Sequence, residues 1–83
     1  MGRDLDNTMN EYHVFAVWDE AARVWVATSD DVPGLATEAE TVEQLLVKLR
    51  IMIPELLVLS GFKIHSEIPF QLHTDCVDVA RYC

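Results

Sequence analysis

The stretch DDVPGLATEAETVEQLL, residues Asp30–Leu46, decides the fold of this chain. Pro33 fixes φ and Gly34 tolerates positive φ, so together they predict a tight turn. A short polar strand over residues 35–38 follows. Thr41 is then a favourable N-cap residue, and the glutamine three positions later completes a capping box. The stretch predicts a turn, a strand and a capped helix, and it carries no visible catalytic apparatus.

Two segments upstream predict a β-hairpin. Residues 12–18 and 24–29 are rich in aromatic and β-branched residues, as strands are. A polar connection of hairpin length, residues 19–23, joins them. Both faces of the first strand carry apolar side chains. This pattern predicts a central strand, or one whose second face is covered.

The second half of the chain predicts a helix and a last strand. The helix is expected over residues 42–59, with Gly61 as its left-handed C-terminal residue. Pro54 predicts a kink in this helix, or a helix that restarts there. Residues 67–73 alternate as a strand. The tail alternates in the opposite parity, which predicts a bulge near Asp75.

The order of elements is β-β-β-α-β, and it predicts a two-layer α+β domain. A right-handed crossover would place the last strand beside the first and parallel to it. The 83 residues allow one domain, expected over residues 11–83. Residues 1–10 are polar without periodicity, and we expect a flexible leader there.

The charge and the cysteine content narrow the function classes. A net charge of −8, with 14 acidic and 6 basic residues, argues against direct nucleic-acid binding and against an anionic membrane. No secretion signal or bilayer-spanning apolar run is visible. We therefore expect a cytoplasmic protein in which Cys76 and Cys83 are reduced thiols.

The helix carries two apolar stripes at a period of 3.6 residues. The broad arc, expected to pack on the sheet, comprises Val42, Leu45, Leu46, Leu49, Met52, Ile53, Leu56 and Leu57. A narrower outer stripe, Val47, Ile51 and Val58, lies opposite, and its charged rim is formed by Lys48, Arg50 and Glu55. An apolar strip with a charged rim is typical of an interface, and here it predicts a homo-oligomer. Isolated apolar residues on a surface are also normal, which is the alternative.

Four acidic residues surround the Pro-Gly turn and the short strand: Asp30, Asp31, Glu38 and Glu40. We interpret them as an acidic edge that suits a basic partner. The alternatives are a solvated edge, or carboxylates that hold a divalent metal in a nuclease. Inner strand positions carry valine, alanine and tryptophan where such a nuclease needs carboxylates.

Other chemistry has weaker support in the sequence. Zinc ligands would have to gather from a strand, a loop and the last residue, namely from His13, His65, His73, Cys76 and Cys83. No serine-hydrolase, phosphate-loop or dinucleotide motif is present. Trp18 and Trp25 could stack a small ligand, although paired strand tryptophans more often pack together. We therefore expect no catalytic residue, no metal and no cofactor.

Residues 12–61 resemble the HicB-like antitoxin domain family. The likeness lies in the opening strand, in Trp25–Ser29, in the Asp31–Gly34 turn and in the Thr41 helix start. It implies a degenerate ribonuclease-H-like sheet with one main helix and no catalytic carboxylates. Family antitoxins often oligomerise, and they bind a small basic toxin that cleaves messenger RNA. Their usual C-terminal DNA-binding segment has no counterpart here, since the residues after Gly61 predict strand.

These observations favour a non-enzymatic protein-protein interaction domain that self-associates and neutralises a small basic ribonuclease toxin. Two alternatives remain open: a metal-dependent nuclease that retains ribonuclease-H-like chemistry, and a small-ligand binding module.

Overall fold

The computed structural model describes residues 12–64, 67–78 and 80. The elements in chain order are β1 (Tyr12–Asp19), β2 (Val24–Thr28), β3 (Ala36–Ala39), α2 (Val42–Leu59) and β4 (Phe70–Asp75). The leader predicted over residues 1–10 lies outside the described residues, as do His65 and Cys83.

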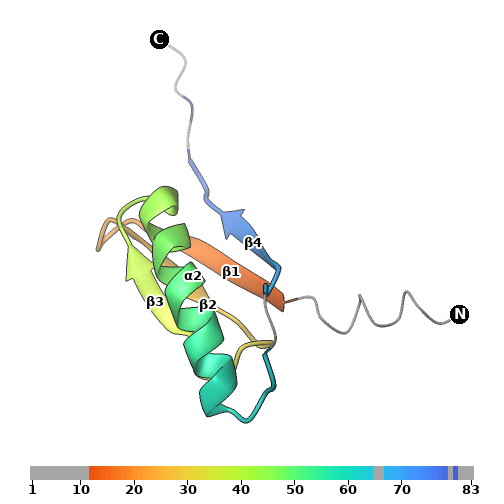
Figure 1. Cartoon of the computed structure of the whole chain (residues 1–83). Helices are drawn as coiled ribbons and strands as arrows, with labels where there is room; N and C mark the ends of the chain where they lie inside the picture. The colour runs from red at the N-terminus through yellow and green to blue at the C-terminus, as the bar shows by residue number, and fades with distance from the viewer. Residues whose placement is uncertain (1–11, 65–66, 79, 81–83) are drawn as a thin grey trace, which may run out of the picture.

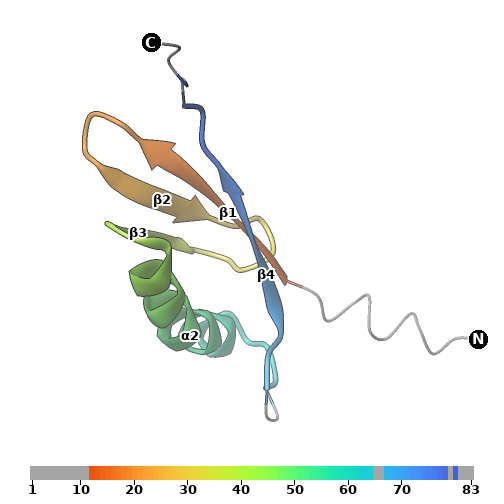
Figure 2. The ribbon, with the colours of Figure 1, turned by 90° about the horizontal axis from the view of Figure 1, so that it is seen from above.

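The strands form one mixed four-stranded sheet in the order β3-β2-β1-β4. β1 pairs antiparallel with β2, which pairs antiparallel with β3. β4 lies parallel to β1 at the opposite edge (Figure 1), as the crossover rule predicts. α2 covers one side of this sheet, and no described element covers the other (Figure 2). The molecule is an α+β domain of two layers, as expected.

The core lies between α2 and the inner face of the sheet. From the strands it takes Val14, Ala16, Ala27 and Ala39, all buried. From α2 it takes Leu45, Leu49, Ile53 and Leu57, each at most 1% exposed. The small alanines in the sheet let the helix approach closely, and the large leucines fill the space between the layers. The other members of the predicted arc, Val42, Leu46, Met52 and Leu56, are half-buried.

Local signals set both ends of α2. The Thr41 hydroxyl accepts a hydrogen bond from the Gln44 amide at 3.1 Å, which confirms the predicted N-cap. At the other end Gly61 adopts φ 90°. The Phe62 amide donates to the Leu57 carbonyl at 2.9 Å and the Gly61 amide to the Val58 carbonyl at 3.0 Å. This pair of bonds is a Schellman motif, which ends the helix where the glycine predicts.

Two turns use positive φ. Gly34 takes φ 80° in the turn before β3, and the Leu35 amide donates to the Val32 carbonyl at 3.2 Å. This is the geometry that the Pro-Gly pair predicts. Arg23 takes φ 62° at the end of the β1–β2 connection. A side chain at that φ carries steric strain, because only glycine adopts it freely.

The structure corrects three expectations. α2 is one continuous helix through Pro54, so the helix does not restart there. β4 begins at Phe70 rather than at residue 67, since Pro69 has no N–H to donate to a ladder. The register from Tyr12↔Phe70 to Val17↔Asp75 is continuous, so the chain leaves the sheet after Asp75 without the predicted bulge.

Leu49→Ala is expected to lower the free energy of unfolding by about 2–5 kcal/mol, because it opens a cavity in a fully buried site. Urea denaturation followed by circular dichroism measures this. Leu59→Ala is the matched control, since the same side chain is 81% exposed at the end of the same helix. Equal effects of the two substitutions would contradict this placement of the core.

Candidate interaction surfaces

The outer stripe lies on the side of α2 that faces away from the sheet. Val47 is 52% exposed, and Ile51 and Val58 are each 59% exposed. Pro54 lies inside the same helix and is half-buried. The spacing of Val47, Ile51, Pro54 and Val58 alternates between four and three residues, so the four lie on one side of the helix. Sequence reasoning treated Pro54 only as a helix breaker, although this spacing was visible.

Two rim residues of the stripe lie on opposite flanks of α2. Lys48 lines a groove between α2 and β3, and its Nζ donates to the main-chain carbonyl of Glu38 at 2.5 Å. Arg50 lines a second groove, between α2 and the approach to β4. Glu55 is exposed. The rim is therefore continuous with a groove on each side of the helix.

The first of these grooves joins the two surfaces that the sequence suggested separately. Its volume is about 500 Å³. The residues that line it are Val24, Glu38, Ala39, Glu40, Gln44, Val47 and Lys48. Apolar side chains therefore lie next to two of the four predicted acidic residues. We call this the β3 groove. An apolar floor beside carboxylates suits a partner that presents basic and apolar side chains together.

The other two acidic residues lie at the opposite end of the sheet. Asp30 and Asp31 come after the end of β2, whereas Glu38 pairs with Val26 in the middle of β2 and Glu40 follows the last residue of β3, near the start of β2. The predicted acidic edge is thus two separate groups. The four residues are close in the chain, but Asp30 and Asp31 come before β3, whereas Glu38 lies in it and Glu40 comes after it.

Asp31 has a structural contact. Its Oδ2 accepts a hydrogen bond from the His13 amide at 2.8 Å, near the start of β1. The hydroxyl of Ser29 donates to the His13 carbonyl at 2.6 Å and accepts from the Asp31 amide at 3.0 Å. These bonds fasten the β2–β3 connection to β1 and orient the turn that leads to β3.

A further exposed surface is the outer face of the sheet. Phe15 and Val17 point away from α2 and are 52% and 53% exposed. Val17 pairs with Val26, and Phe15 pairs with Thr28 and His73. Apolar residues on both faces of β1 predicted a central strand or a covered second face. β1 is indeed a central strand, but no described element of the chain covers that face.

Aromatic rings cross from β1 to β4 on this outer face. The Nδ1 of His13 lies 3.0 Å from Nε2 of His73, at hydrogen-bond distance. The ring of His73 stacks on Phe15 with a centroid separation of 4.8 Å. These contacts join the two parallel strands beyond their backbone ladder. His13 and His73, two of the three histidines considered as zinc ligands, therefore pack between the strands.

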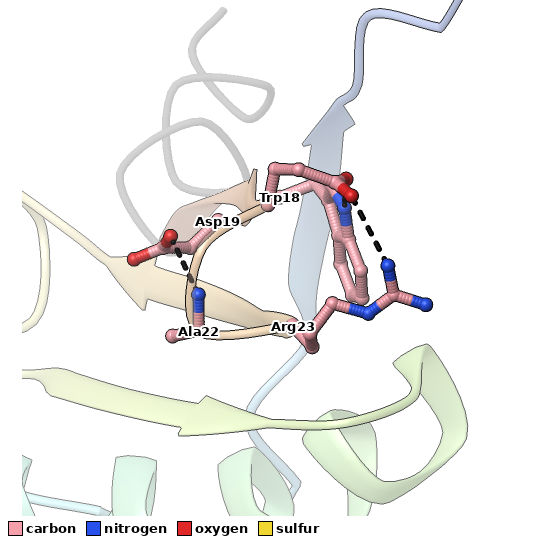
Figure 3. A network of polar contacts seen from close by, with 5 residues as sticks. Trp18, Asp19, Ala22 and Arg23 are labelled. Carbon is pink, nitrogen blue, oxygen red and sulfur yellow. Dashed lines mark hydrogen bonds and ion pairs between the residues drawn. The ribbon is translucent and has the colours of Figure 1, made fainter.

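The tip of the β1–β2 hairpin carries a polar network (Figure 3). The Glu20 carboxylate accepts from Trp18 Nε1 at 2.7 Å and pairs with the Arg23 guanidinium at 3.1 Å. The Ala22 amide donates to the Asp19 carboxylate at 3.1 Å. These contacts accompany the positive φ of Arg23 and hold the turn. Trp18 also meets Trp25 edge to face, with ring centroids 5.4 Å apart.

The described residues contain no group of three or more histidine, cysteine or acidic side chains that could hold a metal ion. Cys76 is a free, exposed cysteine. Within the part of the chain that the structure describes, no helix combines the length and the apolar character needed to cross a membrane.

Comparison with known proteins assigns a family. A family model described as a domain of unknown function, DUF1902, matches residues 11–82. The chain belongs to the DUF1902 family. A crystal structure of a hypothetical protein from the extremely thermophilic bacterium Thermus thermophilus is similar to this chain, with 49% sequence identity and a TM-score of 0.65. The match covers 87% of this chain and 99% of the other. No curated protein matched.

In this DUF1902 chain, Asp31→Ala is expected to lower the free energy of unfolding by about 1 kcal/mol, because the His13 amide loses its acceptor. Asp30→Ala is the matched control and should change it by less than about 0.5 kcal/mol. Thermal denaturation of both variants measures the difference. A stability of Asp31→Ala equal to that of the control would show that this hydrogen bond does not hold the loop.

Proposed function

We propose that this chain is a non-enzymatic protein-protein interaction domain that self-associates through the outer stripe of α2 and binds a basic partner at the β3 groove. The observation that carries the proposal is the exposure of Val47, Ile51 and Val58 along one line of the helix. Burying each such side chain in a contact is worth up to about 1.5–3 kcal/mol. Aligned side chains can be buried together by one partner helix.

The stripe has the spacing of a helix-to-helix seam. Apolar positions that alternate between four and three residues keep one side of a helix facing its partner. Lys48 and Glu55 lie on the same flank of this seam, one residue after its first position and three residues before its last. In an antiparallel pair of α2 helices, Lys48 of one copy approaches Glu55 of the other, and the reverse pair forms by symmetry. The rim is therefore complementary to itself.

The acidic character supports a basic second partner. The net charge of −8 favours association with positively charged proteins. Glu38 and Glu40 place part of this charge beside the apolar lining of the β3 groove. In addition, the chain resembles HicB-like antitoxin domains, whose sheet is a degenerate ribonuclease-H-like one and whose targets are small basic toxins that cleave messenger RNA. We infer the same class of partner here, which implies a cytoplasmic role.

Self-association is tested with Ile51→Asp. A charge in the middle of the stripe should lower the mass of the assembly measured by analytical ultracentrifugation, because an unpaired carboxylate cannot be buried at low cost. Leu59→Asp is the matched control, since Leu59 is an exposed helix residue that is not part of the stripe. Wild-type protein that sediments as a monomer at high concentration would contradict self-association.

The basic partner is tested with the protein encoded beside this chain. We expect a small basic ribonuclease there, and equimolar chain should block its cleavage of RNA. Glu40→Lys should weaken this inhibition, because it reverses a charge at the β3 groove. Asp30→Lys makes the same charge change at the other end of the sheet and should leave the inhibition intact. RNA cleavage that persists with saturating chain would contradict the toxin-binding role.

A further inference from the structure

We propose that the free edge of β4 pairs with β4 of a second copy of this chain, and that Arg50 and Glu67 hold this contact across the groove beside the strand. This contact is separate from the outer stripe of α2 and is an additional interface. It follows from how the two edges of the sheet differ, and from the charges that line the groove.

The two edge strands differ in how they are protected against pairing. β3 has four residues, one of them charged, and Lys48 Nζ already occupies the main-chain carbonyl of Glu38. Short length and charged side chains are the usual devices that protect an edge. β4 has six residues, and its one charged residue, Asp75, is the last, so the five before it include no proline, lysine, arginine or carboxylate. Such an edge is a template for a further strand.

A groove lies beside this edge on the helix side of the sheet. Its volume is about 530 Å³, and its apolar lining includes Ile53, Ile68 and Phe70. Ile68 and Phe70 are only half-buried within the chain. A strand added to β4 would bring its own inward side chains over this lining. Pairing at the edge and burial in the groove therefore support the same contact.

Charge identifies the occupant as a second copy. Arg50 and Glu67 line the same groove, and neither makes an ion pair within the described residues. A two-fold contact is isologous, so Arg50 of each copy can meet Glu67 of the other. Two copies with a net charge of −8 each repel one another overall. Opposite charges at this contact would offset part of that repulsion. A basic partner would favour the carboxylates of the β3 groove over this balanced pair.

The structure thereby assigns Arg50 a role that the sequence did not suggest. Its spacing placed it in the rim of the outer stripe, but its side chain lies on the β4 flank of the helix. Pro54 borders both surfaces, but Ile51, the central residue of the stripe, does not line this groove. The two contacts can therefore be removed one at a time.

The test is a charge exchange between copies that already carry Ile51→Asp, which removes the helix contact. Ile51→Asp protein should remain dimeric by analytical ultracentrifugation. Adding Arg50→Glu or Glu67→Arg should weaken this dimer by about tenfold or more, because each places like charges across the two-fold axis. An equimolar mixture of the two should regain affinity, since the heterodimer restores both opposite-charge pairs.

The outcomes separate this inference from the proposed function. If Ile51→Asp is monomeric while the wild type is dimeric, the β4 contact is overturned and the outer stripe stands. If the charge variants stay dimeric, or their mixture regains nothing, the roles of Arg50 and Glu67 are overturned. Denaturation midpoints equal to that of Ile51→Asp show that the added substitutions leave the fold intact.

Hydrogen exchange tests the strand pairing itself. Backbone amides of Gln71–Thr74 that face the free edge should exchange more slowly in the Ile51→Asp dimer than in the same protein diluted to monomer. Adding Glu67→Arg should abolish this concentration dependence. Exchange rates in β4 that do not depend on concentration would overturn the edge pairing.

Discussion

The packing of α2 on one face of the sheet is the contact on which the rest of the structure depends. Leu45, Leu49, Ile53 and Leu57 fill the space above small strand residues such as Ala16 and Ala27. The hydrogen bonds of the sheet align the strands, but burial of these side chains supplies most of the stabilisation. The N-cap, the Schellman motif and the Pro-Gly turn determine where this helix begins, ends and approaches the sheet.

In the described part of this small chain, α2 is the only helix that covers the sheet. Small domains bury a smaller share of their surface than large ones, so apolar residues remain outside the core. In this chain most of them gather on the outer stripe of α2 and on the outer face around Phe15 and Val17, while half-buried ones line the groove beside β4. Contact with other protein surfaces would bury the apolar side chains that the single core leaves exposed.

Local signals in the sequence predicted most of the fold. Thr41, Pro33-Gly34 and Gly61 act through the backbone within a few residues, and the apolar period of α2 identified its buried side. The chain order and the crossover rule placed β4 beside β1. The start of β4 was misjudged, because the alternation begins before Pro69 whereas pairing begins after it. The four acidic residues divide into two groups, because Asp30 and Asp31 precede β3 whereas Glu38 lies within it and Glu40 follows it.

The sequence by itself determined the elements, their order, the buried side of the helix and the exposed stripe, because each follows from neighbours along the chain. Only the tertiary structure decided which distant residues lie together: Asp31 bonds the His13 amide, His73 stacks on Phe15, and Arg50 and Glu67 line one groove. Such contacts depend on the position and orientation of the helix and of the strands relative to one another. Tertiary packing determines this arrangement, and no single segment of the sequence encodes it.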